Sequence, residues 1–472
     1  MKEKDNDDLN RRDFIKLGTA ATIGATIIGS NILSGGCTEK LSPSENYMGD
    51  YVAPKIEKIR CGFIGVGARG GGHLFWAADN PNAEIVAISD PHIPTVEERM
   101  KQLKERNKQN VKVYSNGDKD YLRMLKDENL DAVFVSTPWE WHAKQAIATM
   151  ESGAHVFVEV PLAVSMEELW QIIETSERTQ KHCMMMENVN YGREELMYLN
   201  MCRQNVIGEL LHGEASYIHE LRGQMFQEDH GTGSWRTLHY SKRNGNLYPT
   251  HGLGPVAQYM NIARTEDLFS TIVSYSSPAI GRKLFAENNF GKDHKWNKIG
   301  YNCGDINTSI IKTKLGRTIL LQWDETSPRP YSRLNLIQGT KGTLAGFPTR
   351  IALDGQDYHH WMQGEEELQP LYEKYEHPLW VRVGEEAVKA GGHGGMDYIM
   401  RYRIFECLMN GEPLDQNVYE GAFWSAAGIL SEESVKENGE LQEFPDFTRG
   451  AWKNTKPLEI IGHNVNQTKT AV

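Results

Sequence analysis

Residues 59–70 read IRCGFIGVGARG, a short apolar run that passes directly into a glycine-rich turn. The turn has a G-x-G-x-x-G pattern formed by Gly65, Gly67 and Gly70, with Arg69 before the last glycine. Such glycines permit a tight turn and let a pyrophosphate approach the backbone at a helix N-terminus. The chain holds 44 glycines, so the pattern alone is weak. Its place between a predicted strand and a predicted helix is what indicates a dinucleotide site.

Apolar runs alternate with helical patterns throughout the first half of the chain. We expect strands at residues 59–64, 84–89, 111–114, 131–136, 154–158 and 183–187, with helices between them. Ser165 and Glu168 form a predicted capping box for the helix that ends near Thr179. Repeated βα units of this kind predict a doubly wound parallel sheet of the Rossmann type, over residues 58–190.

The pattern changes after Gly208. Strands are expected at residues 210–221, 268–276, 306–314, 317–323 and 333–338, and helices at 254–263 and 396–409. Strands without helical crossovers predict a mostly antiparallel sheet. We therefore expect an α+β domain over residues 191–456 that binds the substrate, followed by a tail at 457–472.

Size and charge exclude several classes of protein. The chain has 472 residues, more than one hydrophobic core usually supports. The net charge is -12, and no basic block beyond the N-terminus would neutralise a phosphate backbone, so a nucleic-acid partner is not expected. No run after the N-terminal segment is apolar enough to span a bilayer. The cysteines lack metal spacing, so neither a metal site nor a disulfide framework is expected.

The N-terminal segment is interpreted as an export signal. Residues 10–16 read NRRDFIK and precede an uncharged stretch at 17–36, which resembles a twin-arginine signal over residues 1–37. The stretch ends at Cys37 in an imperfect lipoprotein processing site, so a lipid anchor and simple export both remain open. Residues 38–57 are expected to be a linker. The protein would act in the periplasm or as a membrane-anchored lipoprotein.

Asp90 ends the second predicted strand of the Rossmann domain. An acidic side chain there accepts hydrogen bonds from ribose hydroxyls and repels a 2′-phosphate, which favours NAD over NADP. The alternative is a turn or helix cap, for which Asp-Pro is a suitable sequence.

Two further strand ends are predicted to meet at the same crevice, because ligands of open α/β sheets lie at the carboxyl ends of the strands. The first is Thr137-Pro138-Trp139-Glu140-Trp141-His142 and the second is Glu159-Val160-Pro161. We expect Trp139, Glu140, Trp141, His142, Glu159 and Val160 near the cofactor. The alternatives are packing for the tryptophans and a helix-cap role for His142.

These motifs together resemble the Gfo/Idh/MocA oxidoreductases over residues 58–433. Within that family, the segments 187–191 (ENVNY), 248–251 (YPTH) and 392–397 (GHGGMD) are similar to the exported NAD-dependent α-N-acetylgalactosaminidases of glycoside hydrolase family 109. The resemblance implies a tightly bound NAD that is not consumed, Asn188 among its contacts, a glycan or glycoside substrate and a possible homodimer through an exposed sheet.

The sequence departs from the dehydrogenases of the resembled family at two positions. Val160 occupies the place of their proton-transferring lysine, and Leu247 the place of an aspartate before the active-site histidine. Either this enzyme performs a different reaction with the same cofactor, or other side chains move the protons.

The predicted reaction is a glycosidase cycle through a transient oxidation. No paired Asp/Glu motif of ordinary glycosidases stands out. Instead, bound NAD would take hydride from C3 of the sugar, a base would remove the acidified C2 proton, and the aglycone would leave, followed by hydration and return of the hydride with overall retention. We choose His251 and Tyr191 as the proton-transfer groups, since imidazole titrates near neutral pH and a tyrosine can serve if its pKa is lowered. The alternatives are a helix-cap histidine and a packed aromatic at the domain junction.

The resemblance also implies a set of sugar contacts, in which aromatic rings stack on apolar sugar faces. They are Tyr217, Arg236, Tyr248, Pro249, Thr250, His251 and Tyr331. Each aromatic among them could equally belong to the core, and His393, which lies among glycines, is left out of the catalytic set. Two other functions remain open: a sugar dehydrogenase that releases NADH, and a non-catalytic sugar-binding protein that retains NAD.

Overall fold

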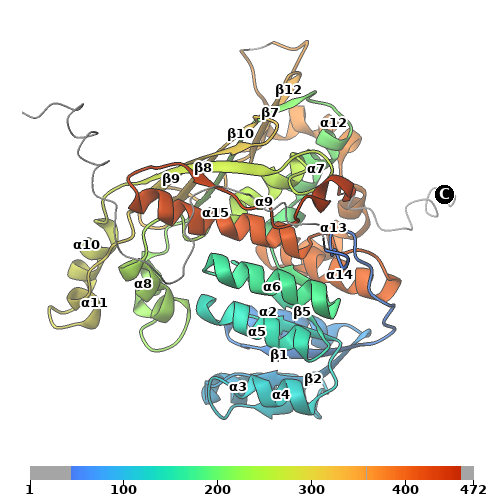
Figure 1. Ribbon diagram of the computed structural model, residues 1–472, viewed down its shortest axis with the longest axis vertical. Helices are drawn as coiled ribbons and strands as arrows, with labels where there is room; N and C mark the ends of the chain where they lie inside the picture. Colours follow the sequence, from blue (N-terminus) through green and yellow to red (C-terminus); the bar gives the residue numbers. More distant parts are fainter. Residues whose placement is uncertain (1–43, 358, 459–472) are drawn as a thin grey trace, which may run out of the picture. The chain divides into compact units, whose positions relative to one another are not determined.

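A computed structural model describes residues 44–357 and 359–458 (Figure 1). The predicted export signal, Cys37 and the first part of the linker lie outside the described residues, as does the tail from residue 459. Along the described ranges no helix combines the length and hydropathy that a membrane span needs. The same ranges contain no cluster of His, Cys, Asp or Glu side chains that could hold a metal ion.

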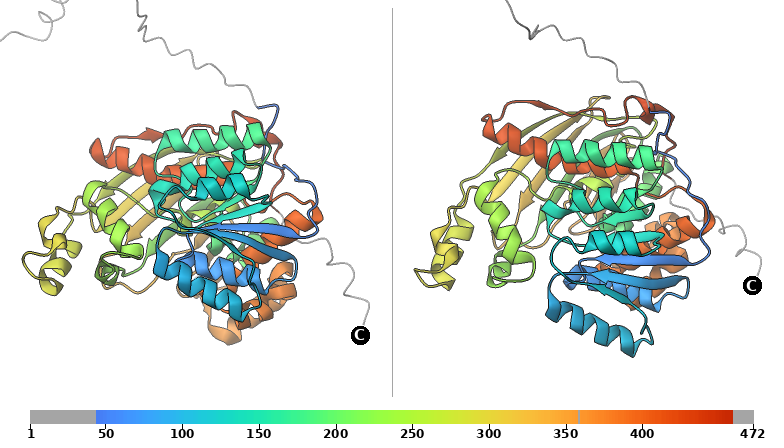
Figure 2. Two further views of the ribbon diagram at one scale, coloured as in Figure 1. Left: turned by 90° about the horizontal axis from the view of Figure 1, so that it is seen from below. Right: turned by 60° about the horizontal axis from the view of Figure 1, so that its bottom comes forward.

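The first sheet confirms the predicted doubly wound parallel architecture. Its six strands run in the order β3-β2-β1-β4-β5-β6, and every neighbouring pair is parallel. They are β1 (Ile59–Ile64), β2 (Ala83–Ser89), β3 (Lys112–Tyr114), β4 (Ala132–Val135), β5 (His155–Val158) and β6 (Cys183–Met185). The connecting helices are α2 (Ala68–Asp79), α3 (Ile93–Glu105), α4 (Tyr121–Asp127), α5 (Trp139–Glu151) and α6 (Met166–Thr179). They cover both faces of the sheet (Figure 2).

The local signals in this domain are confirmed in part: Ser165 caps α6, but the Glu168 carboxylate accepts from the Val164 amide at 3.4 Å, so the predicted capping box is only half formed. Strands β4 and β5 are buried along their whole length, as expected for strands covered on both faces. Ser165 caps α6 by accepting a hydrogen bond from the Glu168 amide at 3.3 Å. The helix ends at Gln180, which adopts a left-handed conformation.

The second sheet has nine strands in the order β14-β13-β12-β11-β7-β10-β9-β8-β15. Its strands are β7 (Leu210–Ile218), β8 (Phe269–Ser276), β9 (Ile306–Thr313), β10 (Thr318–Asp324), β11 (Leu336–Gly339), β12 (Gly342–Ala345), β13 (Arg350–Leu353), β14 (Met362–Gln363) and β15 (Gln442–Glu443). Only the pair of β7 with β10 is parallel, which agrees with the mostly antiparallel prediction. The last predicted strand begins late, at Leu336, because Leu334 and Asn335 have positive φ values of 58° and 49°.

Several helices of the second domain were not predicted. The helical elements are η1 (Asn188–Tyr191), α7 (Arg193–Arg203), η2 (Arg222–Phe226), α8 (Thr232–Lys242), α9 (Thr250–Tyr259), α10 (Gly281–Asn289), α11 (Lys295–Lys298), α12 (Gly364–Tyr375), α13 (Pro378–Ala390), η3 (His393–Gly395), α14 (Met396–Asn410), α15 (Val418–Lys436) and η4 (Ala451–Asn454). Helix α9 begins four residues before the predicted start at residue 254 and includes His251. Glycine and proline near residue 250 are local signals against a helix, but tertiary packing overrides them. Helix α9 packs so closely on β7 that a Cβ on Gly252 would lie 2.3 Å from the Ser216 amide nitrogen.

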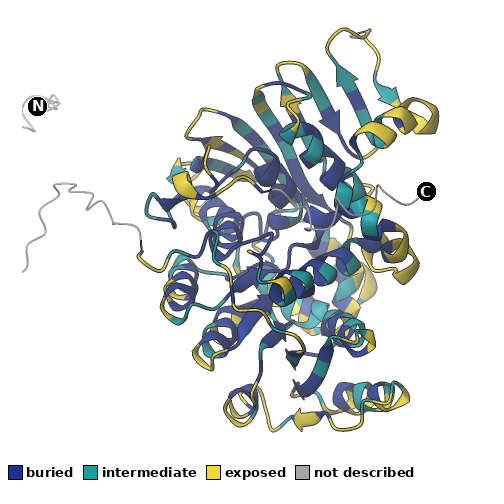
Figure 3. Cartoon of the chain, turned by 90° about the vertical axis from the view of Figure 1, so that its right-hand side faces the viewer, coloured by how far each residue is buried: buried dark blue, intermediate teal, exposed yellow. Residues whose placement is uncertain are grey.

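The two sheets are joined by helices from the end of the chain. Helix α15 lies between strand β8 and helix α6 of the Rossmann domain (Figure 1), and α14 contacts α2. Most residues of α15 are buried, and buried residues concentrate along both sheets (Figure 3). The described part of the predicted linker, residues 44–57, is also packed, since the rings of Tyr47 and Tyr419 stack with centroids 4.7 Å apart. The second domain and the Rossmann domain thus share one continuous core.

Candidate active site

The glycine-rich turn between β1 and α2 has the geometry of a phosphate cradle. Gly65 has a φ of +79°, and a Cβ on Gly70 would lie 1.9 Å from the Gly65 carbonyl oxygen. These two glycines therefore make the tight turn itself. A Cβ on Gly67 would have no heavy atom within 4 Å. The open face of Gly67 lies on a cavity of about 580 Å³, where a pyrophosphate could approach the backbone.

Asp90 lies at the carboxyl end of β2 and lines the same cavity. One carboxylate oxygen accepts a hydrogen bond from the Val66 amide and the other from the His92 amide, both at 2.9 Å. The turn interpretation of Asp90 is therefore correct. It does not exclude the ribose role, because each carboxylate oxygen retains a further lone pair. That role stays a prediction.

The strand end after β4 divides into two groups of side chains. Trp139 and His142 line the cavity, and the His142 ring nitrogens lie 2.7 Å from the Pro161 carbonyl and 2.8 Å from the Thr137 carbonyl. Glu140 and Trp141 do not line it: Glu140 bonds to His239 at 3.2 Å, and Trp141 carries Lys144 over its ring at 5.4 Å. The structure thus brings two of these four residues to the candidate cofactor site.

Glu159, at the end of β5, belongs to a buried network of charges. Arg69 lies between Glu159 and Asp397, with a 2.7 Å contact to each, and His73 contacts Glu159 at 2.7 Å. Burial alone would raise the pKa of Glu159, but Arg69 and His73 lower it to about 2. Burial together with the charge of Arg401 lowers the pKa of His73 to about 4.

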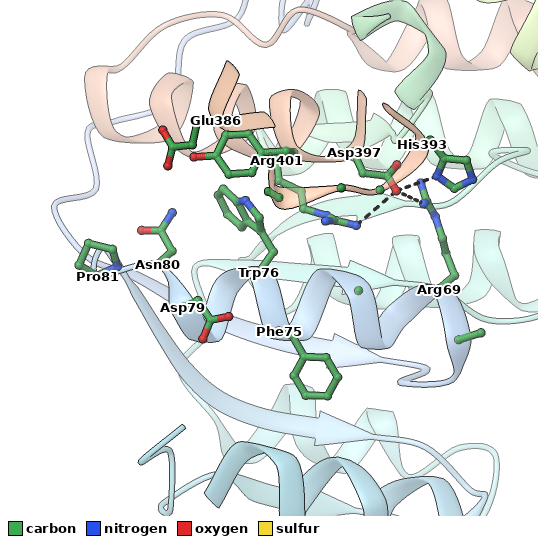
Figure 4. A pocket seen from close by; sticks show the side chains of 16 residues that line it. Arg69, Phe75, Trp76, Asp79, Asn80, Pro81, Glu386, His393, Asp397 and Arg401 are labelled. Carbon is green, nitrogen blue, oxygen red and sulfur yellow. Dashed lines mark hydrogen bonds and ion pairs between the residues drawn. The ribbon is translucent and has the colours of Figure 1, made fainter. Parts of the chain in front are cut away.

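Asp397, at the start of α14, holds four side chains of the site. It accepts a hydrogen bond from Arg69 at 2.7 Å, contacts His393 Nδ1 at 2.9 Å and lies 3.8 Å from Arg401 (Figure 4). It also accepts a hydrogen bond from Asn188 at 2.8 Å. Burial would raise the pKa of Asp397, but the His393 bond and the arginine charges bring it well below its usual range. The carboxylate therefore stays ionised and fixes the cofactor side of the cavity to the second domain.

A loop of the second domain reaches the Rossmann domain beside Asp90. The His230 ring stacks on the His92 ring with centroids 3.8 Å apart, and Thr95 Oγ1 lies within 3.3 Å of His230 Nε2. Both histidines line the cavity. This contact brings the second domain to the part of the cavity where Asp90 would hold a ribose.

Aromatic rings form the opposite wall of the cavity. The rings of Tyr217 and Tyr248 pack together with centroids 4.9 Å apart. The guanidinium carbon of Arg236 lies 4.8 Å from the centroid of the Tyr248 ring. All three line the cavity, and among the described residues the buried Nε of Arg236 has no hydrogen-bond partner. Tyr331 does not line the cavity: it is 40% exposed, and its ring centroid lies 6.2 Å from that of Tyr217, behind which it extends the aromatic cluster. These rings form a cluster suited to the apolar face of a sugar.

The predicted catalytic histidine, His251, lies in the first turn of α9 and on the cavity wall. Its Nδ1 contacts Glu187 Oε1 at 2.6 Å, and Glu187 is fully buried. A proton on Nδ1 would make this contact a hydrogen bond to the Glu187 carboxylate and would leave Nε2 as the acceptor. Pro249 caps α9 and Thr250 is buried at its start, and neither lines the cavity.

Comparison with known proteins matches both halves of the chain. Residues 191–454 match the family model described as glycosyl hydrolase 109, C-terminal domain, and residues 59–187 match the oxidoreductase family, NAD-binding Rossmann fold. The chain belongs to glycosyl hydrolase family 109. It is 60% identical over 422 residues to glycosyl hydrolase family 109 protein 1 of Akkermansia muciniphila, which covers 89% of this chain and 88% of that protein. It is 54% identical to a family 109 protein of Shewanella baltica, over 96% of this chain and 99% of the relative.

Solved structures share the fold of this family 109 chain. An NAD-binding oxidoreductase from Klebsiella pneumoniae superposes with a TM-score of 0.63 at 15% identity, over 82% of this chain and 100% of that chain. Levoglucosan dehydrogenase in complex with NADH has a TM-score of 0.60 at 17% identity, and the match covers 82% of this chain and 99% of that chain. The resemblance to the Gfo/Idh/MocA fold is thereby confirmed.

Tyr191, the second residue predicted to be catalytic, does not line the cavity. Its side chain is buried, and its hydroxyl donates to Asp415 at 3.2 Å. Burial, followed by the charge of Asp415, raises the pKa of this phenol well above its usual range. The geometry favours the packed-aromatic alternative, while the catalytic role remains a prediction.

Three residues that the sequence interpretation left out belong to the wall or its support in the family 109 chain. They are Glu187 behind His251, His219 bonded to the Tyr217 hydroxyl at 2.9 Å, and His393 beside Asp397. The strand-end rule could have found Glu187, which lies two residues beyond the end of β6. His393 belongs to the glycine-rich segment 392–397 that carries the family resemblance, whereas no local signal marks His219.

Proposed function

We propose that this chain is a retaining, NAD-dependent α-N-acetylgalactosaminidase. One observation carries the proposal: within the described chain, both carboxylates on the cavity wall are committed to the cofactor side. Asp90 binds backbone amides, and Glu159 is paired with Arg69 and His73. A two-carboxylate mechanism needs a pair that flanks the glycosidic bond. Histidines on the sugar side suit a redox route instead.

The residues of the cradle fit a dinucleotide. The open face of Gly67 would take the pyrophosphate, Asp90 the ribose hydroxyls, and the buried Oδ1 of Asn188, which has no partner among the described residues, a donor of the cofactor. Bound NAD would supply a hydride acceptor for C3 of the sugar and return the hydride at the end of the cycle.

His251 is the residue proposed to hold the proton of the sugar hydroxyl O3. Its ring lies 5.2 Å from Tyr217 and 4.9 Å from Tyr248, within the aromatic cluster expected to bind the sugar. Glu187 fixes the tautomer that leaves Nε2 free to accept a proton. The buried carboxylate also stabilises the imidazolium that forms.

A second group must remove the proton at C2, which becomes acidic once C3 is a ketone. Tyr191 is the sequence-based candidate, but its hydroxyl is bonded to Asp415. His393 lies on the cavity wall with Asp397 on its Nδ1, so it is the second imidazole available for proton transfer. Elimination of the aglycone, addition of water and re-reduction complete a hydrolysis with retention.

The proposed route is tested by hydrolysis of an aryl α-N-acetylgalactosaminide in deuterated water. We expect released phenol, no accumulation of free NADH, and deuterium at C2 of the released sugar. Stoichiometric NADH in solution would indicate a dehydrogenase, and no turnover with NAD bound would indicate a sugar-binding protein. Full activity without deuterium at C2 would contradict the redox route.

Export is a further proposal, supported by the twin-arginine pattern of Arg11 and Arg12. Changing both to lysine should retain the protein in the cytoplasm, as fractionation and immunoblotting would show. Changing Cys37 to alanine should move an anchored protein from the membrane fraction to the soluble envelope fraction. Unchanged distribution of either variant would contradict the corresponding prediction.

A further inference from the structure

A second cavity of about 910 Å³ lies beside the candidate active site, between α2 and the segment that joins α13 to α14. We call it the α2 groove. Arg69 and His393 line both cavities. Figure 4 shows these two side chains at one end of the groove and Trp76, Asn80 and Pro81 farther along α2. The groove therefore continues from the wall of the sugar cavity toward the surface.

The partition between the two cavities is one short loop. Residues 391–395 all have positive φ values, between 51° and 101°. Glycines occupy four of these positions, so the loop presents a single side chain, that of His393, which is 60% exposed. His393 therefore borders both cavities, as do Ala68 and Arg69 of α2.

Under the proposed function, two ligands share the candidate active-site cavity. Its volume of about 580 Å³ has to hold the dinucleotide as well as the sugar, and the stacked rings of His92 and His230 line it beside Asp90. A glycosidase that releases terminal residues must place the rest of its substrate elsewhere. The larger volume adjoining His393 is the α2 groove.

The chemistry of the α2 groove suits an uncharged sugar chain. Its aromatic side chains Phe75, Trp76 and Tyr398 are half-buried, and the carboxylates of Asp79 and Glu386 are exposed. Aromatic faces stack on the apolar faces of sugars, and carboxylates accept hydrogen bonds from hydroxyl groups.

The cations of the groove are already paired, which argues against an anionic ligand. Arg69 is bonded to Glu159 and Asp397. Arg401 is bonded to His73 at 2.9 Å and is 8% exposed. Exposed carboxylates beside paired arginines would repel a sulfated or carboxylated chain.

We propose that the α2 groove binds the aglycone side of the substrate, as an uncharged carbohydrate chain that passes His393 and lies along α2. The inference rests on the proposed glycosidase function. It assigns specificity for extended glycans to the groove residues that do not line the candidate active site, such as Trp76 and Tyr398.

Ala390 offers a variant that fills the groove without disturbing the core. It is the last residue of α13, is exposed and lines the groove, so Ala390→Trp should block it. Val381→Trp is the matched control, because Val381 lies on the same helix, is 73% exposed and does not line either cavity. Thermal unfolding of both variants would verify that they remain folded.

The kinetic test compares two substrates. One is an aryl α-N-acetylgalactosaminide, and the other is a linear, uncharged tetrasaccharide that ends in α-linked N-acetylgalactosamine. Ala390→Trp should raise KM for the tetrasaccharide about tenfold or more and leave both constants for the aryl substrate within about twofold of the unmodified protein. Val381→Trp should change neither. An equal effect on both substrates, or no effect on either, would overturn the proposal.

A binding measurement separates this inference from the glycosidase function. The probe is the matching trisaccharide that lacks N-acetylgalactosamine, titrated into the NAD-loaded protein by calorimetry. Binding that Ala390→Trp abolishes and Val381→Trp preserves would support the groove even if the protein hydrolysed neither substrate. A trisaccharide that does not bind, or that binds both variants equally, would overturn it.

Discussion

Two imidazole–carboxylate pairs face the candidate active site, and they differ in what holds them. His251 lies in the first turn of α9 with a side chain 15% exposed, and its partner Glu187 is fully buried. His393 lies in a loop of left-handed backbone with a side chain 60% exposed, and Asp397 is its link to the core. The same chemical pair is thus built once into a packed helix and once into a glycine loop.

The difference in burial suggests different tasks for the two pairs. The packed pair fixes one ring nitrogen at a defined point of the cavity wall. The exposed pair instead joins the cofactor network to the partition between two cavities, since Asp397 also holds Arg69 and Asn188. Substitutions in the His251–Glu187 pair should change the rate of the chemical step. Substitutions in the His393–Asp397 pair should also change the affinity for NAD and the stability of the fold.

The largest effect is expected at the packed pair. His251→Ala should lower kcat for the aryl glycoside by ~10²–10⁴-fold, because a general acid or base contributes that much. His212→Ala is the matched control, since His212 of β7 is bonded to Thr318 of β10 and lines neither cavity. A loss of less than about threefold for His251→Ala would remove His251 from the mechanism.

The network behind the exposed pair predicts a loss of stability in acid. His73 has a pKa of about 4 in the folded protein against 6.5 ordinarily, because burial and Arg401 disfavour its charged form. Neutral His73 therefore contributes fully to the free energy of unfolding above pH 6.5. This contribution, ~3 kcal/mol at most, is lost as the pH falls through about 4. Urea unfolding between pH 7 and pH 4 would measure it. A pH dependence that is identical in His73→Gln would contradict this assignment.

The two carboxylates should respond differently to neutralisation. Glu187→Gln should lower kcat about tenfold through the lost charge behind His251 and leave NAD affinity unchanged. Asp397→Asn should weaken NAD binding as well, because Arg69 loses an ion-pair partner. Turnover at saturating NAD and calorimetric titration of NAD would separate the two effects. Equal loss of NAD affinity in both variants would show that the pairs are not distinct.

Asp90 belongs to neither pair, and its substitution should affect NAD binding alone. Asp90→Ala removes the predicted acceptor for the ribose hydroxyls, so NAD should dissociate about tenfold more readily, while kcat at saturating NAD is retained. Dialysis followed by absorbance of the retained dinucleotide would measure the loss. Retention equal to that of the unmodified protein would leave Asp90 with its turn role only.

The smallest effect is expected at Tyr191. Its hydroxyl is bonded to Asp415 and lies away from the cavity, and Asp415 keeps its ion pair with Arg403 in Tyr191→Phe. We expect kcat to fall by less than about tenfold, in contrast to His251→Ala. A larger loss, with enzyme-bound NADH still formed but no deuterium exchange at C2, would instead establish Tyr191 as the base.

The cofactor half of the site was largely predictable from the sequence. Gly65, Gly67, Gly70 and Asp90 follow consecutive strands, and the geometry of a parallel sheet brings strand ends together. Their neighbours were less predictable: Glu140 and Trp141 share a helix turn with Trp139, but only Trp139 lines the cavity.

The parallel Rossmann sheet, its glycine-rich turn and the change to a second, mostly antiparallel sheet follow from the sequence, because these features depend on local periodicity and on glycine. The polar groups that meet in the site are set by the packing of distant elements. Glu187 reaches His251 across 64 residues, and Arg69 reaches Asp397 across 328. Such pairings depend on α9 packing against β7 and on α14 returning to α2, which no local pattern encodes. Buried charges then take whichever partners that packing brings within reach, because an unpaired charge in the core is too costly to keep.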